Sequence, residues 1–404
     1  MTEAYIVATA RSPIGRARKG SLVDVRPDDL AARMVRAALD LLPGLDPARI
    51  DDLLVGCGQP AGEQGFNLAR IVAVLAGLDA VPGATVNRYC SSSLQTTRMA
   101  FHAIRAGEGD VFVSAGVETV SRYGAGASDV PGAVNPAFAA STARTAARAE
   151  VRAPTWSDPR DDGALPDPYI AMGQTAENVA QLRGISRGEQ DAFAARSQQR
   201  AEAAIASGFW ARDITPVTLA DGTVVSADDG PRAGVTVEAL AGLDPVFRPD
   251  GTVTAGNCCP LNDGAAAVVV VSDRVVDELG LQPLARIVST GVSGLSPEIM
   301  GLGPVEASRR ALARADLSID DMDLVEINEA FAAQVIPSAR ELGVDPDRLN
   351  VHGGAIAVGH PFGMTGARIT STLINGLAVT GGRYGLETMC VGGGQGMAMV
   401  LERV

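Results

Sequence analysis

The chain has 404 residues, of which 46% are hydrophobic and 20% charged, and its formal net charge is −13. This length and composition are typical of a globular protein with two or three domain-sized units. The acidic balance argues against binding to nucleic acids or to anionic membranes, because both require a basic face.

The cysteines and the N-terminal residues indicate the cellular compartment in which the protein is expected. Five cysteines form an odd set without the spacing of a disulfide framework or a metal site, so we expect free thiols in a reducing environment and no metal. The first residues lack the pattern of a secretory signal, and no apolar run approaches membrane-spanning length. Lys19 is the only lysine among many arginines, which suggests a GC-rich bacterial genome. The sequence therefore favours a cytoplasmic bacterial protein.

The chain contains a weak internal repeat. An amphipathic helix is predicted from about Pro27 to Leu42, after the start signal Arg26-Pro27-Asp28-Asp29, and an aliphatic strand follows it. A second helix is predicted from about Val305 to Ala315. After both helices come a leucine, then an isoleucine or methionine followed by an aspartate, and then an aliphatic strand. Repeated helix–strand units predict an α/β fold of two similar halves that share a cleft.

Cys90 lies where a short β-branched run, from Ala84 to Asn87, meets a helical pattern. A thiol at such a junction faces unpaired backbone N–H groups and the positive end of the helix dipole. Both features favour the thiolate, which is the nucleophilic form of cysteine. We therefore expect Cys90 to be a nucleophile, and a buried cysteine that only fills the core is the alternative.

The middle of the chain has a different character. Residues 123 to 170 are rich in Ala, Pro, Gly, Arg and Asp and show little periodicity, so we expect a long lid or binding loop. Ser186 and Glu189 form a capping box, which predicts a helix that runs to about Ser207. The buried run Val268 to Val271 predicts a strand that rejoins the first half.

Two glycine-rich segments near the C-terminus supply partners for a reactive thiol. His360, one of only three histidines, stands between a glycine and a proline, which favours a rigid turn close to a ligand. Cys390 follows a predicted strand and precedes three glycines, whose N–H groups can point at a developing oxyanion. A plain turn is the alternative explanation of the three glycines.

Together these segments resemble the thiolases, the acyl-CoA C-acyltransferases, along essentially the whole chain. The motifs, which occur in family order, are Val86-Asn-Arg-Tyr-Cys-Ser-Ser-Ser, Thr254-Ala-Gly-Asn with Asn262-Asp-Gly-Ala-Ala, Asn328-Glu-Ala-Phe-Ala, Gly353-Gly-Ala-Ile-Ala-Val-Gly-His-Pro and Cys390-Val-Gly-Gly-Gly-Gln-Gly. The resemblance implies a five-layered α/β/α/β/α core of two duplicated halves with an inserted loop domain. On this basis we assign residues 1–122 and 251–273 to the first half, 123–250 to the loop domain and 274–404 to the second half. A homodimer or homotetramer is also implied.

The resemblance also implies the chemistry. Cys90 would accept the acyl group, His360 would take its proton, and Cys390 would protonate the acetyl-CoA enolate that leaves a 3-ketoacyl-CoA. Coenzyme A is implied as co-substrate, with no permanently bound cofactor. One oxyanion would be held by His360 and a water bound to Asn328, and the other by the N–H groups of Cys90 and Gly392. For Asn328, a helix N-cap before Glu329 is the alternative reading.

Contacts with CoA are implied by family position. Arg232 would pair with the nucleotide phosphates or stack on adenine, and Met172 and Phe331 would line the pantetheine tunnel. Cys259 occupies a position where many thiolases have a serine that touches the pantetheine arm. This departure weakens the assignment of Cys259.

The Asn-Arg-x-Cys-Ser-Ser pattern around Cys90 is closer to degradative 3-ketoacyl-CoA thiolases than to acetoacetyl-CoA thiolases. We therefore predict thiolytic cleavage of 3-ketoacyl-CoA, with acetoacetyl-CoA formation or cleavage as the first alternative. A ketoacyl-synthase-like condensing enzyme and a non-catalytic partner protein of the same fold are alternatives of another class. The first typically lacks a cysteine at the position of Cys390, and the second normally loses one of the three central residues.

Overall fold

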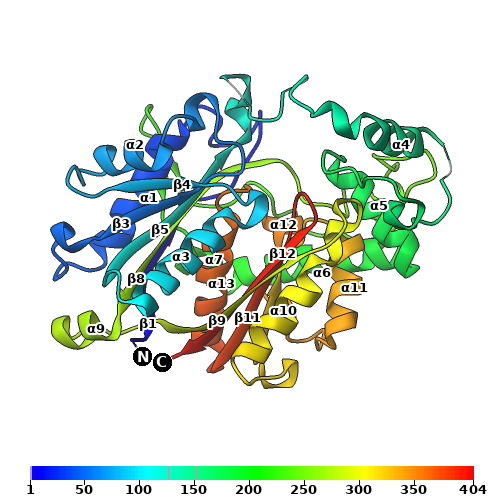
Figure 1. Ribbon diagram of the computed structural model, residues 1–404. Helices are drawn as coiled ribbons and strands as arrows, with labels where there is room; N and C mark the ends of the chain where they lie inside the picture. Colours follow the sequence, from blue (N-terminus) through cyan, green and yellow to red (C-terminus); the bar gives the residue numbers. More distant parts are fainter. Residues whose placement is uncertain (1, 126, 131, 152) are drawn as a thin grey trace.

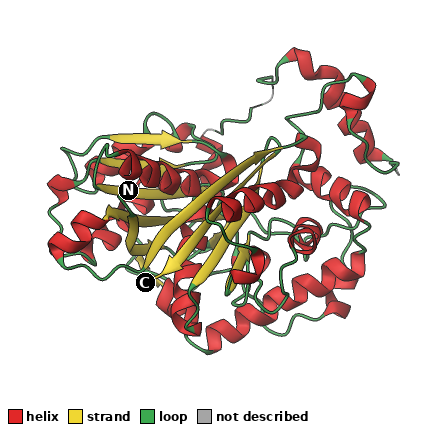
Figure 2. Ribbon diagram, turned by 60° about the horizontal axis from the view of Figure 1, so that its bottom comes forward, coloured by secondary structure: helices red, strands yellow, loops and turns green. Residues whose placement is uncertain are grey.

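The computed structural model describes residues 2–125, 127–130, 132–151 and 153–404. The predicted excursion from 123 to 170 includes residues 126, 131 and 152, which lie outside the described residues. Two sets of strands dominate the molecule, with helices between and around them (Figures 1 and 2).

The strands of the two halves follow the same plan. The first half contributes β1 (Ala4–Arg11), β3 (Asp52–Gly56), β4 (Gly83–Val86), β5 (Val111–Thr119) and β8 (Asn262–Ser272). The second half contributes β9 (Ala285–Gly294), β10 (Leu324–Ile327), β11 (Tyr384–Val391) and β12 (Gln395–Arg403). Three short strands complete the set: β2 (Gly15–Arg16), which pairs with β8, and the hairpin β6 (Val217–Thr218) and β7 (Val224–Val225).

The order β3-β5-β8-β1 in the first half matches β10-β11-β12-β9 in the second. In each half the first two strands are parallel and the other pairs antiparallel. Strand β4 pairs in parallel with β3, and a single parallel bridge between Val325 and Leu349 takes the corresponding place beside β10. The predicted duplication is therefore confirmed at the level of topology. A short antiparallel contact of Tyr5 and Ile6 with the start of β9 joins both halves into one hydrogen-bonded sheet.

The helices form three layers around these strands. Their bounds are α1 (Pro27–Asp40), α2 (Leu68–Leu75), α3 (Ser92–Ala106), α4 (Ala139–Glu150), α5 (Met172–Arg183), α6 (Arg187–Ala206), α7 (Phe209–Asp213), α8 (Val237–Ala241), α9 (Asp273–Leu279), α10 (Gly303–Arg314), α11 (Ala332–Leu342), α12 (Ala355–Val358) and α13 (Thr365–Thr380). Helices α1 and α2 pack on the strands of the first half and α10 on those of the second. Helices α3 and α13 contact each other and lie between the two sets of strands. This is the expected α/β/α/β/α arrangement.

Local sequence signals explain several of these elements. Helix α1 begins with Pro27 in its first turn and buries Leu30, Met34 and Ala38 against the sheet, as predicted. Helix α6 begins with the predicted capping box, in which Ser186 and Glu189 each bond the other's backbone N–H. Strand β8 is fully buried and pairs with both β1 and β5, so it returns to the first half as expected.

The segment from 123 to 170 is not only the long loop that its weak periodicity predicts, because it contains α4, which buries Ser141 and Thr145. Helix α4 projects away from the strands at one end of the molecule (Figure 1). Our domain boundaries remain a prediction. Among the described residues, no helix combines the length and apolar character that a membrane crossing requires.

Candidate active site

Cys90 lies in a 3₁₀ turn, Tyr89–Ser91, between the end of β4 and the start of α3. Tyr89 has a φ of +42°, a strained conformation for a residue with a side chain, and the Asn87 side chain accepts a hydrogen bond from its N–H at 2.8 Å. Ser92 Oγ accepts from the Arg88 N–H at 2.9 Å. The predicted strand-to-helix junction is confirmed, and the strained turn presents the thiol in the manner of a nucleophile elbow.

Two opposing effects set the protonation state of Cys90. The N–H groups of Gly392 and of Cys90 itself donate to the sulfur and lower its pKa, but burial outweighs them and raises the pKa of Cys90 to about 11. The two N–H groups thus favour the thiolate, as expected, but burial has the larger effect in the unliganded protein. Desolvation of a fully buried charge exceeds the gain from two N–H groups and the helix terminus. Cys90 needs a base to become a nucleophile.

His360 is suited to be that base. Its Nδ1 lies 2.6 Å from Thr365 Oγ1, and the Thr365 hydroxyl donates to the Pro361 carbonyl at 2.7 Å. Thr365 therefore accepts from Nδ1–H, which leaves Nε2 unprotonated. Burial and the nearby Arg368 charge lower the pKa of His360 to about 3. The imidazole is thus neutral at physiological pH and can accept a proton at Nε2.

Asn328 lies directly beside this nitrogen, with its Nδ2 3.3 Å from His360 Nε2. The side chain is 1% exposed, and among the described residues its Oδ1 has no hydrogen-bond partner. A buried unfilled acceptor fits a bound water, whose second hydrogen is then available to an oxyanion. The N-cap reading of Asn328 is wrong, because α11 begins four residues later and Phe331 precedes it as N-cap.

Three thiols converge from separate segments. Cys390 lies near the end of β11, fully buried, and Cys259 follows the loop after β7 and α8. Burial raises the pKa of Cys390 well above its ordinary value, and the proximity of Cys90 adds to this effect. The pKa of Cys259 is raised by burial and by both of these thiols. Cys390 is therefore held as a proton-carrying thiol next to the proposed nucleophile.

A cavity of about 530 Å³ opens onto Cys90. Its walls come from the Cys90 turn, the Gly392 turn, Phe362 and residues within 128–130, 133–134 and 168–172. Gly392 and Met172 lie on this wall, and their roles toward the oxyanion and the pantetheine arm remain predictions. The ring of Phe362 packs edge-on against His360 at 5.2 Å between centroids, which places the imidazole behind the wall.

Phe331 and Cys259 are carried by adjoining segments. The N–H of Cys259 donates to the Ala330 carbonyl at 3.0 Å, and Cys258 forms a β-bridge with Phe331. Phe331 is buried and packs against Phe247. These contacts bring the two predicted pantetheine residues together, but neither lines the cavity at Cys90.

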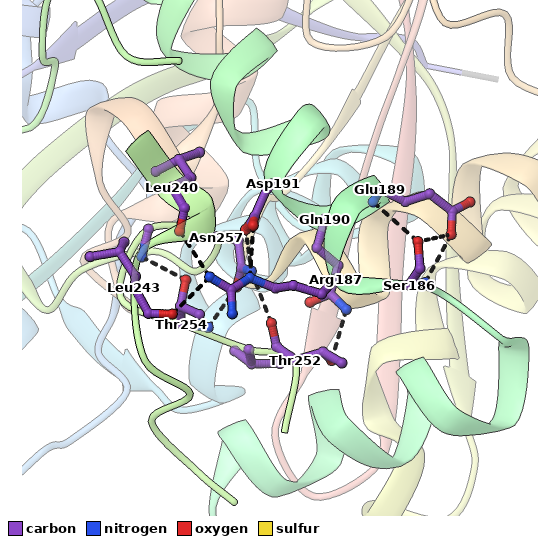
Figure 3. Close-up of polar contacts among 12 residues, drawn as sticks. Ser186, Arg187, Glu189, Gln190, Asp191, Leu240, Leu243, Thr252, Thr254 and Asn257 are labelled. Carbon is purple, nitrogen blue, oxygen red and sulfur yellow. Dashed lines mark hydrogen bonds and ion pairs between the residues drawn. The ribbon is translucent and has the colours of Figure 1, made fainter. Parts of the chain in front are cut away.

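A polar network anchors the loop that leads to Cys259 (Figure 3). Asn257 is fully buried, and its Nδ2 donates to Asp191 on α6 at 2.9 Å and to the Thr252 carbonyl at 3.0 Å. Arg187 donates to the other oxygen of Asp191 and to the carbonyls of Leu240 and Leu243. The Thr254-Ala-Gly-Asn257 motif is thus a brace that fixes the loop rather than a reacting group.

Arg232 lies apart from this cluster. It is exposed, and its backbone N–H donates to Gln198 Oε1 at 2.9 Å. An exposed guanidinium on the loop segment is available to a phosphate. Its contact with CoA remains a prediction.

Sequence reasoning missed three residues that position His360. Thr365 fixes its tautomer, Asn262 Oδ1 accepts from its backbone N–H at 2.9 Å, and Glu118 accepts from the N–H of Gly363 at 2.9 Å. Thr365 follows His360 by five residues in a glycine-rich turn, which is a readable signal. Asn262 and Glu118 come from distant segments, and only the fold brings them to this turn.

Comparisons with known proteins agree with this geometry. The family model described as "Thiolase, N-terminal domain" matches residues 4–274, and "Thiolase, C-terminal domain" matches residues 281–403. The chain belongs to the thiolase family. It is therefore an enzyme of the acyltransferase class that uses CoA as co-substrate, as predicted.

Individual relatives cover the full chain. A protein named beta-ketoadipyl-CoA thiolase from Pseudomonas aeruginosa is 46% identical over 100% of this chain and 99% of its own length. A 3-ketoacyl-CoA thiolase from Bacillus subtilis is 44% identical, with 100% of both chains covered. A crystal structure of the Bacillus anthracis acetyl-CoA acetyltransferase has a TM-score of 0.86 and 40% identity, and covers 100% of this chain and 99% of that one.

Proposed function

We propose that this thiolase cleaves 3-ketoacyl-CoA with CoA, through an acyl-enzyme on Cys90, and that His360 and Cys390 move the protons. The observation that carries this proposal is a set of buried side chains at one cavity. Cys90 lies on its wall, Cys390 is close enough to Cys90 to be affected by its charge, and the His360 ring packs against Phe362 on the same wall. His360 Nδ1 donates to Thr365, so Nε2 is the unprotonated nitrogen. Such a set can take one proton from a nucleophile and give another to a carbanion without opening to solvent.

The proposed steps balance as follows. His360 Nε2 takes the proton of Cys90, and the sulfur attacks C3 of the substrate. The C2–C3 bond then breaks, the acyl group stays on Cys90, and the acetyl-CoA enolate takes the proton of Cys390. CoA next gives its thiol proton to the Cys390 thiolate and attacks the thioester. The released Cys90 sulfur recovers its proton from His360, and an acyl-CoA shortened by two carbons leaves.

Two donor sets would hold the oxyanions. The N–H groups of Cys90 and Gly392 already point at the Cys90 sulfur, so they suit an oxygen on a carbon bound there. The unfilled oxygen of Asn328, with a bound water, and His360 suit the thioester oxygen of the enolate. Removal of one such donor typically lowers kcat by about 10²–10³-fold.

For the acyl chain we favour an uncharged group longer than acetyl. The cavity is larger than a two-carbon acyl group requires, and several apolar residues line it, among them Val130, Val134 and Ile170. A role in fatty-acid degradation is part of this proposal. Acetoacetyl-CoA is the alternative, because one similar solved structure is that of an acetyl-CoA acetyltransferase.

A dicarboxylic acyl group is the second candidate, because several relatives are named for beta-ketoadipyl-CoA. The wall offers the hydroxyls of Tyr89, Tyr169 and Ser128 to a polar tail. It also carries the carboxylate of Asp129, and the described residues that line it include no lysine, arginine or histidine. A free carboxylate would therefore meet a like charge, so we expect 3-oxoadipyl-CoA to react more slowly than an uncharged chain.

The deciding experiment measures CoA-dependent release of acetyl-CoA from acetoacetyl-CoA, a medium-chain 3-ketoacyl-CoA and 3-oxoadipyl-CoA. The highest kcat/KM for the medium chain supports our proposal. A preference for either other substrate assigns the enzyme to that substrate. No cleavage of any of the three contradicts the function.

We further propose a homodimer or homotetramer in the cytoplasm. Strand β4 lies at one edge of the sheet, and Phe66, near it in the chain, is 96% exposed with a φ of +53°. An open strand edge and a fully exposed aromatic ring both favour a protein contact. The five free cysteines support a reducing compartment. Size-exclusion chromatography with light scattering tests the assembly.

A further inference from the structure

Glu118 is a fully buried carboxylate near the end of β5 whose partners are all neutral donors. Its Oε2 accepts from the N–H groups of Gly58 at 2.7 Å and Gly363 at 2.9 Å, and its Oε1 accepts from the Gln59 N–H at 3.2 Å, Gln64 Nε2 at 2.7 Å and the Tyr123 hydroxyl at 2.9 Å. The proposed reaction uses none of these groups directly.

The donors come from segments that meet at the site. Gly363 belongs to the turn that carries His360, and Gly58 and Gln59 follow β3 of the other half. The turn is pressed against β5, since a Cβ on Gly363 would lie 2.2 Å from the Val117 carbonyl oxygen. One carboxylate thus ties the His360 turn of the second half to the framework of the first half.

Gln59 extends this connection to the cavity wall. It is 8% exposed, and its Oε1 accepts from the N–H groups of Ser128 at 2.8 Å and Asp129 at 3.1 Å. Its Nε2 donates to the Asp129 carboxylate. Gln59, Ser128 and Asp129 all line the cavity at Cys90. The same network therefore holds both the proposed base and one wall of the acyl site.

We propose that Glu118 is a positioning residue that fixes the location of His360. Gln59 links Glu118 to residues 128–130 of the cavity wall and thereby affects which acyl chain the enzyme accepts. This inference rests on the proposed function. A carboxylate suits the role because both of its oxygens only accept, whereas a glutamine would turn an NH₂ group toward the donors at one of these two positions. An error of about 1 Å in the position of a reacting group can lower a rate by about 10²-fold.

The first test replaces Glu118 by Gln, which keeps the size of the side chain. We expect kcat for acetoacetyl-CoA to fall by about 10²-fold while KM changes less than about twofold, because the base moves but the binding surface for CoA does not. Glu326→Gln is the matched control, since Glu326 is also a buried strand glutamate, at 3% exposed, but lies on β10 rather than on β5, whose Glu118 bonds the His360 turn. We expect this control to keep the wild-type kcat.

A merely structural role would give a different pattern. Loss of folding stability alone would lower the melting temperature and the amount of active protein, while kcat per active site, titrated by Cys90 labelling, would stay unchanged. That result would overturn the inference. If Glu118→Gln does not fold, Tyr123→Phe removes one donor and keeps the ring, and an unchanged kcat in that variant would also count against it.

The second test replaces Gln59 by Ala. We expect KM for a medium-chain 3-ketoacyl-CoA to change by about tenfold, the scale of one lost hydrogen bond at a site, with the values for acetoacetyl-CoA unchanged. Gln174→Ala is the control, because Gln174 is similarly buried but bonds Phe247 and Arg248 away from the cavity. If Gln59→Ala changes KM equally for both substrates, Gln59 does not affect the choice of acyl chain through the cavity wall, and this part of the inference is wrong.

The two proposals fail separately. If the wild-type protein cleaves none of the substrates, the proposed function is wrong and these variants have no reference activity. If the wild type is active and Glu118→Gln matches it in kcat, the function stands and the positioning role is wrong.

Discussion

The two halves of the molecule share one framework but carry different chemistry. Strands β5 and β11 occupy the same place in their halves, and each runs antiparallel to a long partner strand. Glu118 lies opposite Gly264 and Cys390 lies opposite Gly396, and in each ladder this is the pair before the last. The same position thus holds a proton-carrying thiol in one half and a carboxylate anchor in the other.

The turns before the two central helices differ in the same way. The turn before α3 carries Cys90, and the turn before α13 carries His360. Fold duplication places two such turns and two such strand ends at equivalent positions, and the side chains there decide the chemistry. Substitutions at the matched positions therefore separate what the framework does from what the residues do.

The largest effect should come from Cys90→Ala. This variant removes the group that forms the acyl-enzyme, so we expect kcat to fall by at least about 10⁴-fold. Cys258→Ala is the control, because Cys258 is a free cysteine that does not line the cavity at Cys90. Acetyl-CoA release measured by chromatography checks both, and substantial activity in Cys90→Ala would refute the nucleophile assignment.

Cys390→Ala should lower kcat by about 10²–10⁴-fold, the usual contribution of a general acid or base. Unlike Cys90→Ala, it should leave Cys90 reactive toward iodoacetamide, because the nucleophile and His360 remain in place. Cys258→Ala is the control thiol, and its kcat should equal that of the wild type. A loss of Cys90 labelling in Cys390→Ala would show that Cys390 supports the fold of the site instead.

Thr365→Val removes the acceptor for His360 Nδ1–H and keeps the shape of the side chain. We expect kcat to fall by about 10- to 100-fold, by analogy with metal-binding histidines that lose the partner of their second ring nitrogen. Thr365→Ser retains the hydroxyl and should recover most of the activity. If Ser and Val behave alike, tautomer control by Thr365 is wrong.

The pH dependence of Cys90 labelling tests the protonation state of the nucleophile without any substitution. Because burial raises the pKa of Cys90 to about 11, the thiol is protonated below that pH and its thiolate fraction grows about tenfold per pH unit. Labelling by iodoacetamide should therefore rise steadily from pH 7 to 9 in the unliganded enzyme. Mass spectrometry of the Cys90 peptide measures this labelling. A labelling rate that stays constant between pH 7 and 9 would indicate a preformed thiolate.

Local signals predicted much of the framework. The proline and acidic residues at Pro27–Asp29 gave the start of α1, the capping box gave α6, and the change from β-branched to helical spacing placed Cys90 at a turn. Two features depended on the folded environment. The raised pKa of Cys90 results from burial, which a single segment does not reveal. Glu118 gains its role only because β5 meets turns that are 60 and 245 residues away in the chain.

The most direct test of the central claim is to trap the acyl-enzyme. The protein is mixed with a medium-chain 3-ketoacyl-CoA in the absence of free CoA, quenched in acid and digested, and the Tyr89–Arg98 peptide is weighed by mass spectrometry. We predict that this peptide gains the mass of an acyl group two carbons shorter than the substrate, with release of acetyl-CoA, and that added CoA removes it. Release of acetyl-CoA without an adduct on this peptide, or with the adduct on another cysteine, would contradict the account.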